Sequence, residues 1–254
     1  MRIAVCVKQI PDPAAPYELD PVTHFVVRPA DQVLDDTDRY GVEVGLQLAE
    51  AFGEGATVTL VSMSPAGTLQ GIRQALAMGA DKAVIVDDPG LRGADALTTA
   101  RVLRAAVERE GFDVVVAGTE STDGYSGVVP QQLAELLGVP ALTFARKVEL
   151  TEGTVTVQRQ TAGGYDVVEA SPPVVISVTA GVVEPRYPTF KGIMGARQKA
   201  IDVLSCADLG VTPVVQQTVA EVAPVPARQA GEVVEDDGEA HLRIIAALEQ
   251  AKVI

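Results

Sequence analysis

The sequence predicts an α/β protein built on an open parallel sheet with helices on both faces. Two observations carry this prediction. Short segments that are apolar at every position alternate along the chain with segments whose apolar residues recur at helical spacing. Strands without a polar face are buried on both sides, which is typical of parallel sheets covered by helices. The length of 254 residues and the 47% hydrophobic content suit such a globular fold.

The first parallel strands are expected at four apolar segments, residues 3–7, 58–62, 82–86 and 113–118. The segments between and after them predict helices at residues 38–52, 68–78, 94–109 and 126–137. Gly53, Gly79 and Gly138 directly follow three of these helices, where glycine commonly ends a helix because it adopts left-handed backbone easily. Residues 11–34 contain five prolines and are expected to be irregular.

The pattern changes in the second half of the chain. Residues 146–160 alternate polar and apolar around Glu152-Gly153, which predicts a hairpin, and residues 172–178 predict another buried strand. We therefore expect an α/β domain over 1–210, with a small hairpin region, followed by an extended arm over 211–254.

The arm combines a linker and a helix. Prolines and an acidic run over 211–239 predict the linker, and the helical pattern from Leu242 to Ile254 then resumes. The apolar face of that helix must pack either on the chain's own sheet or on another chain, and it consists of Ile244, Ile245, Leu248 and Val253.

Composition excludes several classes of function. The 20 Lys and Arg against 34 Asp and Glu give a net charge of −14, which disfavours nucleic-acid binding. Lys8 interrupts the first apolar run and no apolar stretch reaches the ~18 residues of a membrane span, so we expect a cytoplasmic protein without membrane insertion. His24 and His241 have no partners at metal-ligand spacing, and no metal site is expected.

Two loops follow strands whose ends should meet at one edge of the sheet. One runs from Cys6 to Asp12 and the other from Gly118 to Gly127, with three glycines and five hydroxyl side chains before a helix start. Glycines let a ligand approach the backbone, and the amides of a helix start attract phosphate. The second loop contains no Lys or Arg and matches neither G-x-G-x-x-G nor the P-loop, which favours a resting nucleotide held by neutral donors over phosphoryl transfer.

Four motifs identify a resemblance that covers nearly the whole chain. They are VCVKQIPD at 5–12, IRQALAMGADKAV at 72–84, the loop at 118–123 with PQQLAELLGVP at 130–140, and VEPRYPTFKGIMGARQK at 183–199. With them the chain resembles the β subunits of electron transfer flavoproteins, a family that includes the FixA-type proteins. The last motif is specific, because no general feature of an α/β fold requires it.

The resemblance implies a Rossmann-like, adenine-nucleotide-binding fold and a heterodimer with a larger α subunit. A redox FAD lies between the subunits and is held mostly by α, while the β pocket holds AMP or, in bifurcating members that meet NADH, a second FAD. Electrons pass from acyl-CoA or related dehydrogenases to a quinone oxidoreductase or another acceptor, as in fatty acid oxidation. The β subunit is then an electron carrier without catalytic residues, and bifurcation is the less favoured case.

The resemblance also implies two sets of site residues. The nucleotide contacts fall on Cys6, Asp35, Asp36, Thr37, Asp38, Met63, Gly118, Thr119, Glu120, Ser121, Thr122, Asp123, Gly124, Tyr125, Ser126, Gly127, Val128 and Val129. The segment that docks on partner dehydrogenases falls on Pro185, Arg186, Tyr187, Pro188, Thr189, Phe190, Ile193 and Met194. Phe190 is the expected anchor of the docking loop, unless it caps the domain's own core.

The chain departs from the family pattern at three places. Asp35-Asp36 stands where Asn-Pro is common, Ala162 precedes the glycine pair at 163–164 where an acid is frequent, and the basic cluster after the docking loop is reduced to Arg197 and Lys199. Two alternatives are a stand-alone pyrophosphatase or ligase and a nucleotide-sensing domain. The first would need a glycine-rich loop where Lys8-Gln9-Ile10-Pro11 stands, and the second leaves the docking segment and the arm unexplained.

Overall fold

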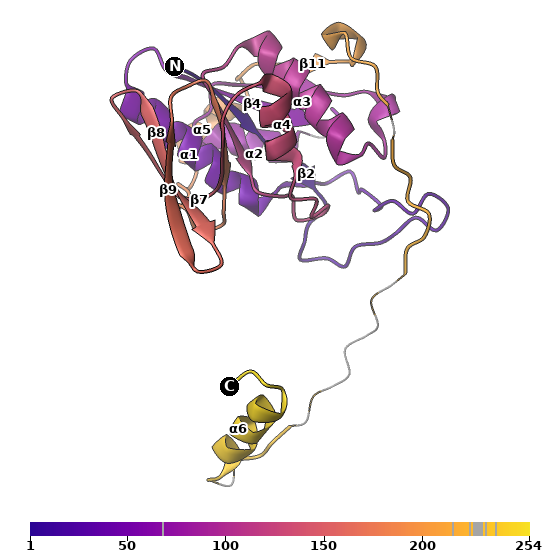
Figure 1. Cartoon of the computed structure of the whole chain (residues 1–254). Coiled ribbons are helices and arrows are strands. Elements are labelled where there is room, and N and C mark those ends of the chain that lie inside the picture. The colour runs from indigo at the N-terminus through magenta and orange to yellow at the C-terminus, as the bar shows by residue number, and fades with distance from the viewer. Residues whose placement is uncertain (68, 215, 224, 226–230, 232, 237) are drawn as a thin grey trace. The chain divides into compact units, whose positions relative to one another are not determined.

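The computed structural model describes residues 1–254 except 68, 215, 224, 226–230, 232 and 237. The chain forms two compact units, Met1–Val219 and Ala220–Ile254. The first unit is the α/β domain and contains the expected parallel sheet (Figure 1). The second unit contains one helix, α6 (Ala240–Gln250), in its described residues.

A nine-stranded sheet forms the centre of the described α/β domain, in the order β11-β5-β4-β1-β6-β10-β7-β8-β9. Its parallel part consists of β1 (Arg2–Cys6), β4 (Thr57–Met63), β5 (Lys82–Val86), β6 (Val114–Gly118), β10 (Val174–Val178) and β11 (Ile201–Leu204). The long strand β7 (Ala141–Thr151) runs parallel to β10 and continues into an antiparallel meander with β8 (Thr154–Thr161) and β9 (Gly164–Ala170). A separate two-stranded sheet pairs β2 (Gln9–Ile10) with β3 (Val33–Leu34).

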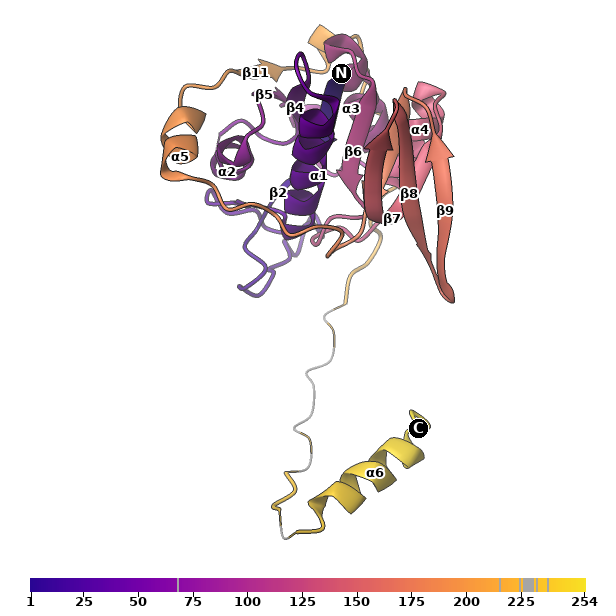
Figure 2. The ribbon, with the colours of Figure 1, turned by 90° about the vertical axis from the view of Figure 1, so that its left-hand side faces the viewer.

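Helices cover both faces of the sheet, because each has one apolar stripe to bury. On one face α1 (Asp36–Phe52) and α2 (Gln70–Met78) pack on a core that includes Val42, Leu76 and Leu60. On the other face α3 (Ala96–Glu110) and α4 (Val129–Leu137) pack on a second core. A short helix, α5 (Phe190–Ala196), lies beside α2 (Figure 2), and two 3-10 turns occupy Pro89–Leu91 and Ala207–Leu209.

The expected fold class is confirmed, and the differences lie at element boundaries. Helix α1 begins two residues early because the Asp35 carboxylate caps it by accepting from the amide of Thr37. The expected helix start at Ser126 is wrong. Helix α4 begins at Val129, because Tyr125 and Gly127 have φ angles of 46° and 64°, which a right-handed helix cannot contain.

Besides the short pair β2 and β3, two strands of the main sheet are not anticipated by the sequence pattern. Strand β9 forms one edge of the sheet and β11 forms the other, and most of their side chains are exposed or half-buried. An edge strand packs on fewer neighbours than a central strand, so its sequence does not become apolar at every position. The segment expected to dock on partner dehydrogenases, residues 185–194, is not a loop throughout, since its second half is the helix α5.

The second unit keeps the expected helix with shifted ends. Helix α6 starts at Ala240 rather than Leu242 and ends at Gln250, so Val253 lies beyond it. None of its described side chains is buried. Within the first unit, the start of the expected linker contacts the α/β domain, because the amide of Gln216 donates to the Asp95 carboxylate at the head of α3.

Candidate functional site

The strands that follow β1 in the chain are added first on one side of it and then on the other, so β1 lies at a switch point in the strand order. From β1 the chain proceeds through α1 to β4 and β5 on one side, and it returns to the other side of β1 with β6. Open α/β sheets bind ligands beyond the carboxyl ends of the strands at such a switch point. The ends of β1 and β6 carry Cys6 and Gly118, so the two loops singled out in the sequence meet at this place.

The head of α1 is tied to the loop after β6. The buried Asp35 carboxylate accepts hydrogen bonds from the amide of Thr37 at 3.0 Å and from the amide of Thr122 at 2.7 Å. The Thr37 hydroxyl donates to the carbonyl of Glu120 at 3.1 Å. One carboxylate therefore caps the helix and holds the Gly118–Gly127 loop against it.

Gly118 makes this close approach possible. A Cβ at that position would lie 3.1 Å from both the Asp38 carboxylate and the Thr37 hydroxyl. Asp38 is buried and accepts from the amide of Lys8 at 2.6 Å. Burial, followed by the neighbouring Asp35 carboxylate, raises the pKa of Asp38 well above its ordinary value.

Cys6 is a packing residue in this site. It is buried in the core formed with α3 and α4. Burial, with a smaller contribution from Asp38, raises the pKa of the Cys6 thiol to about 12, so the thiol is neutral at physiological pH. A neutral buried thiol is neither a nucleophile nor a metal ligand.

The loop after β6 leaves amides at the start of α4. The carbonyl of Ser121 accepts from the amides of Gly124 and Tyr125, which closes the first half of the loop. The amides of Gly127 and Val128 donate no hydrogen bond within the described residues. Together with the positive end of the α4 dipole they favour an anion such as a phosphate.

Asp123 brings two cations to a loop that contains none. Its side chain is 1% exposed and pairs with Lys8 at 2.6 Å and with Arg28. Burial alone would raise the pKa of Asp123, but the charges and hydrogen bonds of Lys8 and Arg28 outweigh it and hold the pKa below its ordinary value. Reasoning from the sequence missed Lys8 and Arg28 because they lie 115 and 95 residues from Asp123.

Three buried polar atoms near the start of α4 have no hydrogen-bond partner within the described chain. They are Oγ1 of Thr122 and Oε1 of Gln131 and of Gln132. Buried polar groups are usually paired, and these three atoms remain available to pair with a bound group. The hydroxyl can donate or accept, and the amide oxygens accept, as a ligand with hydroxyl or amino groups requires.

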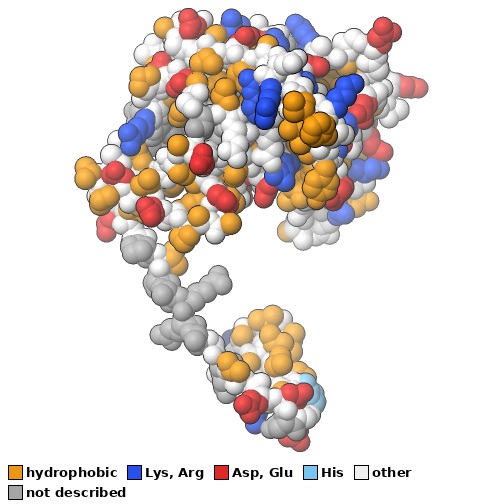
Figure 3. All heavy atoms as spheres, turned by 180° about the vertical axis from the view of Figure 1, so that it is seen from behind, with side chains coloured by type: hydrophobic (Ala, Val, Ile, Leu, Met, Phe, Trp, Pro, Cys, Tyr) orange, Lys and Arg blue, Asp and Glu red, His pale blue; other side chains and the backbone are white. Residues whose placement is uncertain are grey.

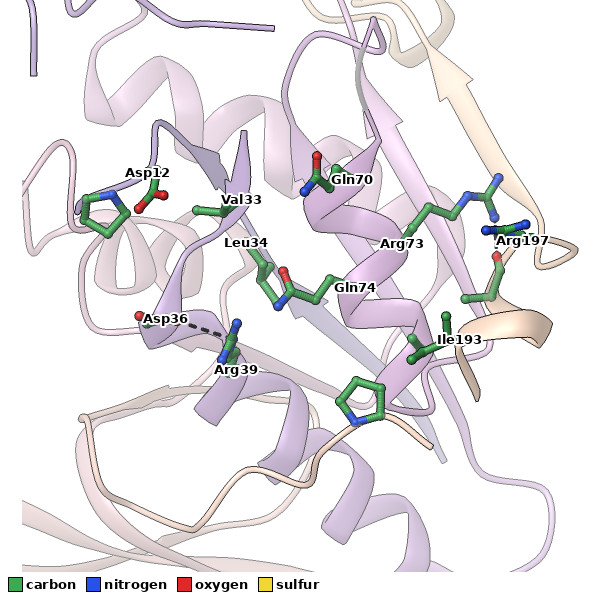
Figure 4. A pocket seen from close by; sticks show the side chains of 14 residues that line it. Asp12, Val33, Leu34, Asp36, Arg39, Gln70, Arg73, Gln74, Ile193 and Arg197 are labelled. Atoms are coloured by element: carbon green, nitrogen blue, oxygen red, sulfur yellow. Dashed lines mark hydrogen bonds and ion pairs between the residues drawn. The ribbon is translucent and has the colours of Figure 1, made fainter. Parts of the chain in front are cut away.

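Two further residues that were predicted to contact the nucleotide are Met63 and Asp36. Met63 ends β4, the strand beside β1, and packs at the edge of the second core. Asp36 is exposed and pairs with Arg39 at 3.3 Å. It lines a different site, a cavity of about 840 Å³ between the head of α1, helix α2 and α5 (Figure 4). Arg39, Arg73 and Arg197 also line that cavity, and Figure 4 shows Arg73 reaching toward the end of α5.

The docking segment carries the most exposed aromatic side chains of this region. Tyr187 is 85% exposed and Phe190 is 81% exposed, so Phe190 does not fill the domain's own core. Thr189 caps α5 by accepting from the amide of Gly192 at 3.0 Å. Helix α5 lies on the face shown in Figure 3, where hydrophobic side chains lie beside Lys and Arg side chains. Arg186 differs from its neighbours because it pairs with Glu43 and Glu50 on α1.

The described residues hold no group of His, Cys, Asp and Glu that could bind a metal ion. Nor is any helix in the part of the chain that the structure describes both long and apolar enough to cross a membrane.

The fold and its switch-point loops define the class, a doubly wound α/β protein of the Rossmann-like type. A family model described as "Electron transfer flavoprotein domain" matches residues 23–209. A Mycobacterium tuberculosis protein named "Electron transfer flavoprotein subunit beta" is 41% identical over 264 residues, which span 100% of this chain and 99% of that protein.

Two further relatives cover most of the chain. A protein of the same name from Thermoanaerobacterium thermosaccharolyticum is 35% identical over 83% of this chain and 81% of its own length. The "Caffeyl-CoA reductase-Etf complex subunit CarD" of Acetobacterium woodii is 31% identical over 84% of this chain and 81% of its own length. The chain belongs to the electron transfer flavoprotein family, and it matches the Mycobacterium tuberculosis β subunit from end to end.

Proposed function

We propose that this chain is the β subunit of a heterodimeric electron transfer flavoprotein and relays electrons as part of that complex. The observation that carries the proposal is the 41% identity to a β subunit over the whole chain, including the arm that follows the α/β domain. A match confined to the sheet would support only the fold, because this fold hosts many functions.

The switch-point crevice binds an adenine nucleotide in this proposal, AMP in the first instance and a second FAD as the alternative. Three features of the site fit such a ligand. The amides of Gly127 and Val128 suit a phosphate, the unpaired polar atoms of Thr122, Gln131 and Gln132 suit hydroxyl or amino groups, and Gly118 lets the loop lie against the head of α1. Lys8 and Arg28 neutralise Asp123, so this carboxylate does not repel a phosphate.

The redox chemistry belongs to an FAD shared with, and mostly held by, the α subunit. When bound, that flavin would supply the electron-accepting and electron-releasing chemistry. The residues of this chain bind and position the nucleotide, and Cys6, whose thiol pKa burial raises to about 12, serves as a packing residue. The chain acts as a carrier subunit, although the relation to a reductase complex subunit keeps bifurcation with NADH as the alternative.

Donor and acceptor follow from the same proposal. The donor is an acyl-CoA dehydrogenase or a related flavin dehydrogenase, and the acceptor is a quinone oxidoreductase or another carrier. The segment Pro185–Met194 docks on the donor with Phe190 as its anchor, since an exposed aromatic on a capped helix can fill a partner's pocket. We place the complex in the cytoplasm.

The arm over 211–254 serves the α subunit in this proposal. Helix α6 exposes Leu242, Ile244, Ile245 and Leu248, and an apolar stripe of this kind is costly to leave in water. The linker before it is long enough to reach another subunit.

Co-expression with the α subunit tests the function. We expect a yellow heterodimer on size exclusion, and mass spectrometry of the released ligands to find FAD together with AMP. Two equivalents of FAD and no AMP would assign the second FAD to this chain. A chain that stays separate from the α subunit, with the flavin held by α alone, would contradict the proposed function.

A further inference from the structure

Arg186 joins the start of the docking segment to α1. Its Nε and backbone amide donate to Oε2 of Glu43 at 2.7 and 3.1 Å, and its Nη2 donates to Oε1 of the same carboxylate at 2.9 Å. Its Nη1 donates to Glu50, about two turns further along α1, at 2.7 Å. A two-pronged guanidinium–carboxylate pair fixes orientation as well as distance.

The pair is buried on the carboxylate side. The Glu43 side chain is 4% exposed and that of Arg186 is 35% exposed. Gln47 donates a further hydrogen bond to Glu43 at 2.8 Å, so this carboxylate is held from both directions. A buried ion pair contributes little net stability, but losing one partner leaves a buried charge unpaired. Detaching the segment from α1 would therefore leave the buried Glu43 carboxylate without its cationic partner.

The other end of the segment is fixed to α2. Nη1 of Arg73 donates to the carbonyls of Ala196 and Lys199, and Nζ of Lys199 donates to the carbonyls of Leu76 and Ala80 at the end of α2. Gly192 passes so close to α2 that a Cβ there would lie 2.5 Å from the carbonyl oxygen of Ala77. A helix of seven residues is not stable alone, so these contacts determine where α5 lies.

We propose that Arg186, with Glu43 and Glu50, is a positioning clamp that presents Tyr187 and Phe190 to the electron donor in one orientation. The clamp contacts neither the donor nor a cofactor. It removes alternative arrangements of the segment before docking, so that less ordering is required on association. This inference rests on the docking role proposed above, and it assigns to Arg186 a part different from that of the exposed residues.

The test uses the intact heterodimer with a purified acyl-CoA dehydrogenase, reduced by its acyl-CoA, as the donor. The single variant Arg186→Lys keeps the positive charge but loses the planar, two-pronged guanidinium. The double variant Arg186→Gln with Glu43→Gln removes the ion pair and leaves no unpaired charge at either position. We expect each to raise the KM for the donor about tenfold with little change in kcat, because the docked geometry stays attainable. Hydrogen exchange should accelerate in residues 187–196 and stay unchanged in α3.

Arg104→Gln is the matched control, since Arg104 forms an ion pair with Glu108 at 3.0 Å on α3, away from the segment. It should leave KM and exchange unchanged. Phe190→Ala separates the two proposals. If Phe190→Ala raises KM while the Arg186 variants change neither KM nor exchange, the clamp is overturned and the docking role stands. If Phe190→Ala has no effect on KM, the docking role fails, and the inference about Arg186 fails with it even where exchange accelerates.

Discussion

The acidic residues around the head of α1 show how burial and partners divide one residue type into different roles. Asp35 is a cap that accepts two backbone amides, while Asp36 beside it is exposed. Asp38 is buried with a raised pKa, and Asp123 is buried with a lowered one because two cations pair with it. Position in the chain does not distinguish these four carboxylates, and the three-dimensional neighbours do.

Replacing Asp35 by alanine tests the cap. The amides of Thr37 and Thr122 lose their acceptor, so we expect Asp35→Ala to destabilise the α/β domain by about 1–2 kcal/mol. Urea denaturation measures the loss. Asp36→Ala is the control and should stay close to wild type, because the Asp36 side chain is 72% exposed. Equal stability of the two variants would show that Asp35 does not hold the loop to α1.

The lowered pKa of Asp123 predicts that the stability of the fold decreases as the pH falls into the acidic range. Its pKa in the folded chain lies below the ordinary value of 3.8, so the paired carboxylate stabilises the fold above that value. The contribution is lost as the pH falls through the folded pKa. We expect urea midpoints, followed from about pH 7 to about pH 3, to fall more steeply in wild type than in Asp123→Asn. Parallel curves would contradict an ion pair with Lys8 and Arg28.

Replacing Phe190 by alanine tests the proposed docking role of residues 185–194. An exposed aromatic anchor typically contributes roughly 2 kcal/mol or more to binding, so Phe190→Ala should weaken affinity for the donor dehydrogenase about 30-fold. Folding and flavin content should not change, because the side chain is 81% exposed. Val167→Ala on β9 is the control, being 67% exposed and distant from the segment in sequence. A fall in thermal stability with unchanged affinity would assign Phe190 to the fold instead.

At the scale of elements, the parallel strands and the helices between them carry strong local patterns, and the peripheral elements do not. Strands β1, β4, β5 and β6 are found where the apolar runs predict them. Strands β9 and β11 are not predicted, because each lies at an edge and keeps polar side chains. Helix α5 is missed for a different reason, since seven residues that begin after Pro188 and Thr189 have no helical repeat long enough to recognise.

Helix α6 is the element whose role is tested by deletion. Removing residues 232–254 should abolish stable pairing with the α subunit, because burying four apolar side chains of α6 is worth about 1.5–3 kcal/mol each before ordering costs. The thermal midpoint of the α/β domain should change little, since none of the described α6 side chains is buried. Size exclusion with full-length α subunit measures the pairing. Co-elution with unchanged affinity would remove the arm from the interface.

At the scale of the whole molecule, the chain presents a half-site. The loops beyond the carboxyl ends of β1 and β6 offer amides and hydroxyls but no complete dinucleotide motif, and the exposed apolar segments lie outside the core. A chain of net charge −14 with such surfaces is suited to a permanent partner rather than to nucleic acid.

The lone chain should therefore be colourless. Purified without its partner, it should show no flavin absorbance in the visible range, and adding α subunit with FAD should restore the yellow colour. A stoichiometric flavin that stays with the lone chain through size exclusion would contradict this expectation. It would favour a second FAD over AMP in the crevice.

The amino-acid sequence by itself determined the sheet class, the succession of the central strands and helices along the chain, and the family, because these depend on local periodicity and on contiguous motifs. The exposure of Phe190 also agrees with its place in a polar, proline-bounded segment. Only the tertiary structure decided the pairings across the chain, such as Asp123 with Lys8 and Arg28, Asp35 with Thr122, and Arg186 with Glu43. Those contacts join residues between 87 and 143 positions apart, and no local pattern encodes a partner at that distance, since packing alone brings the two side chains together.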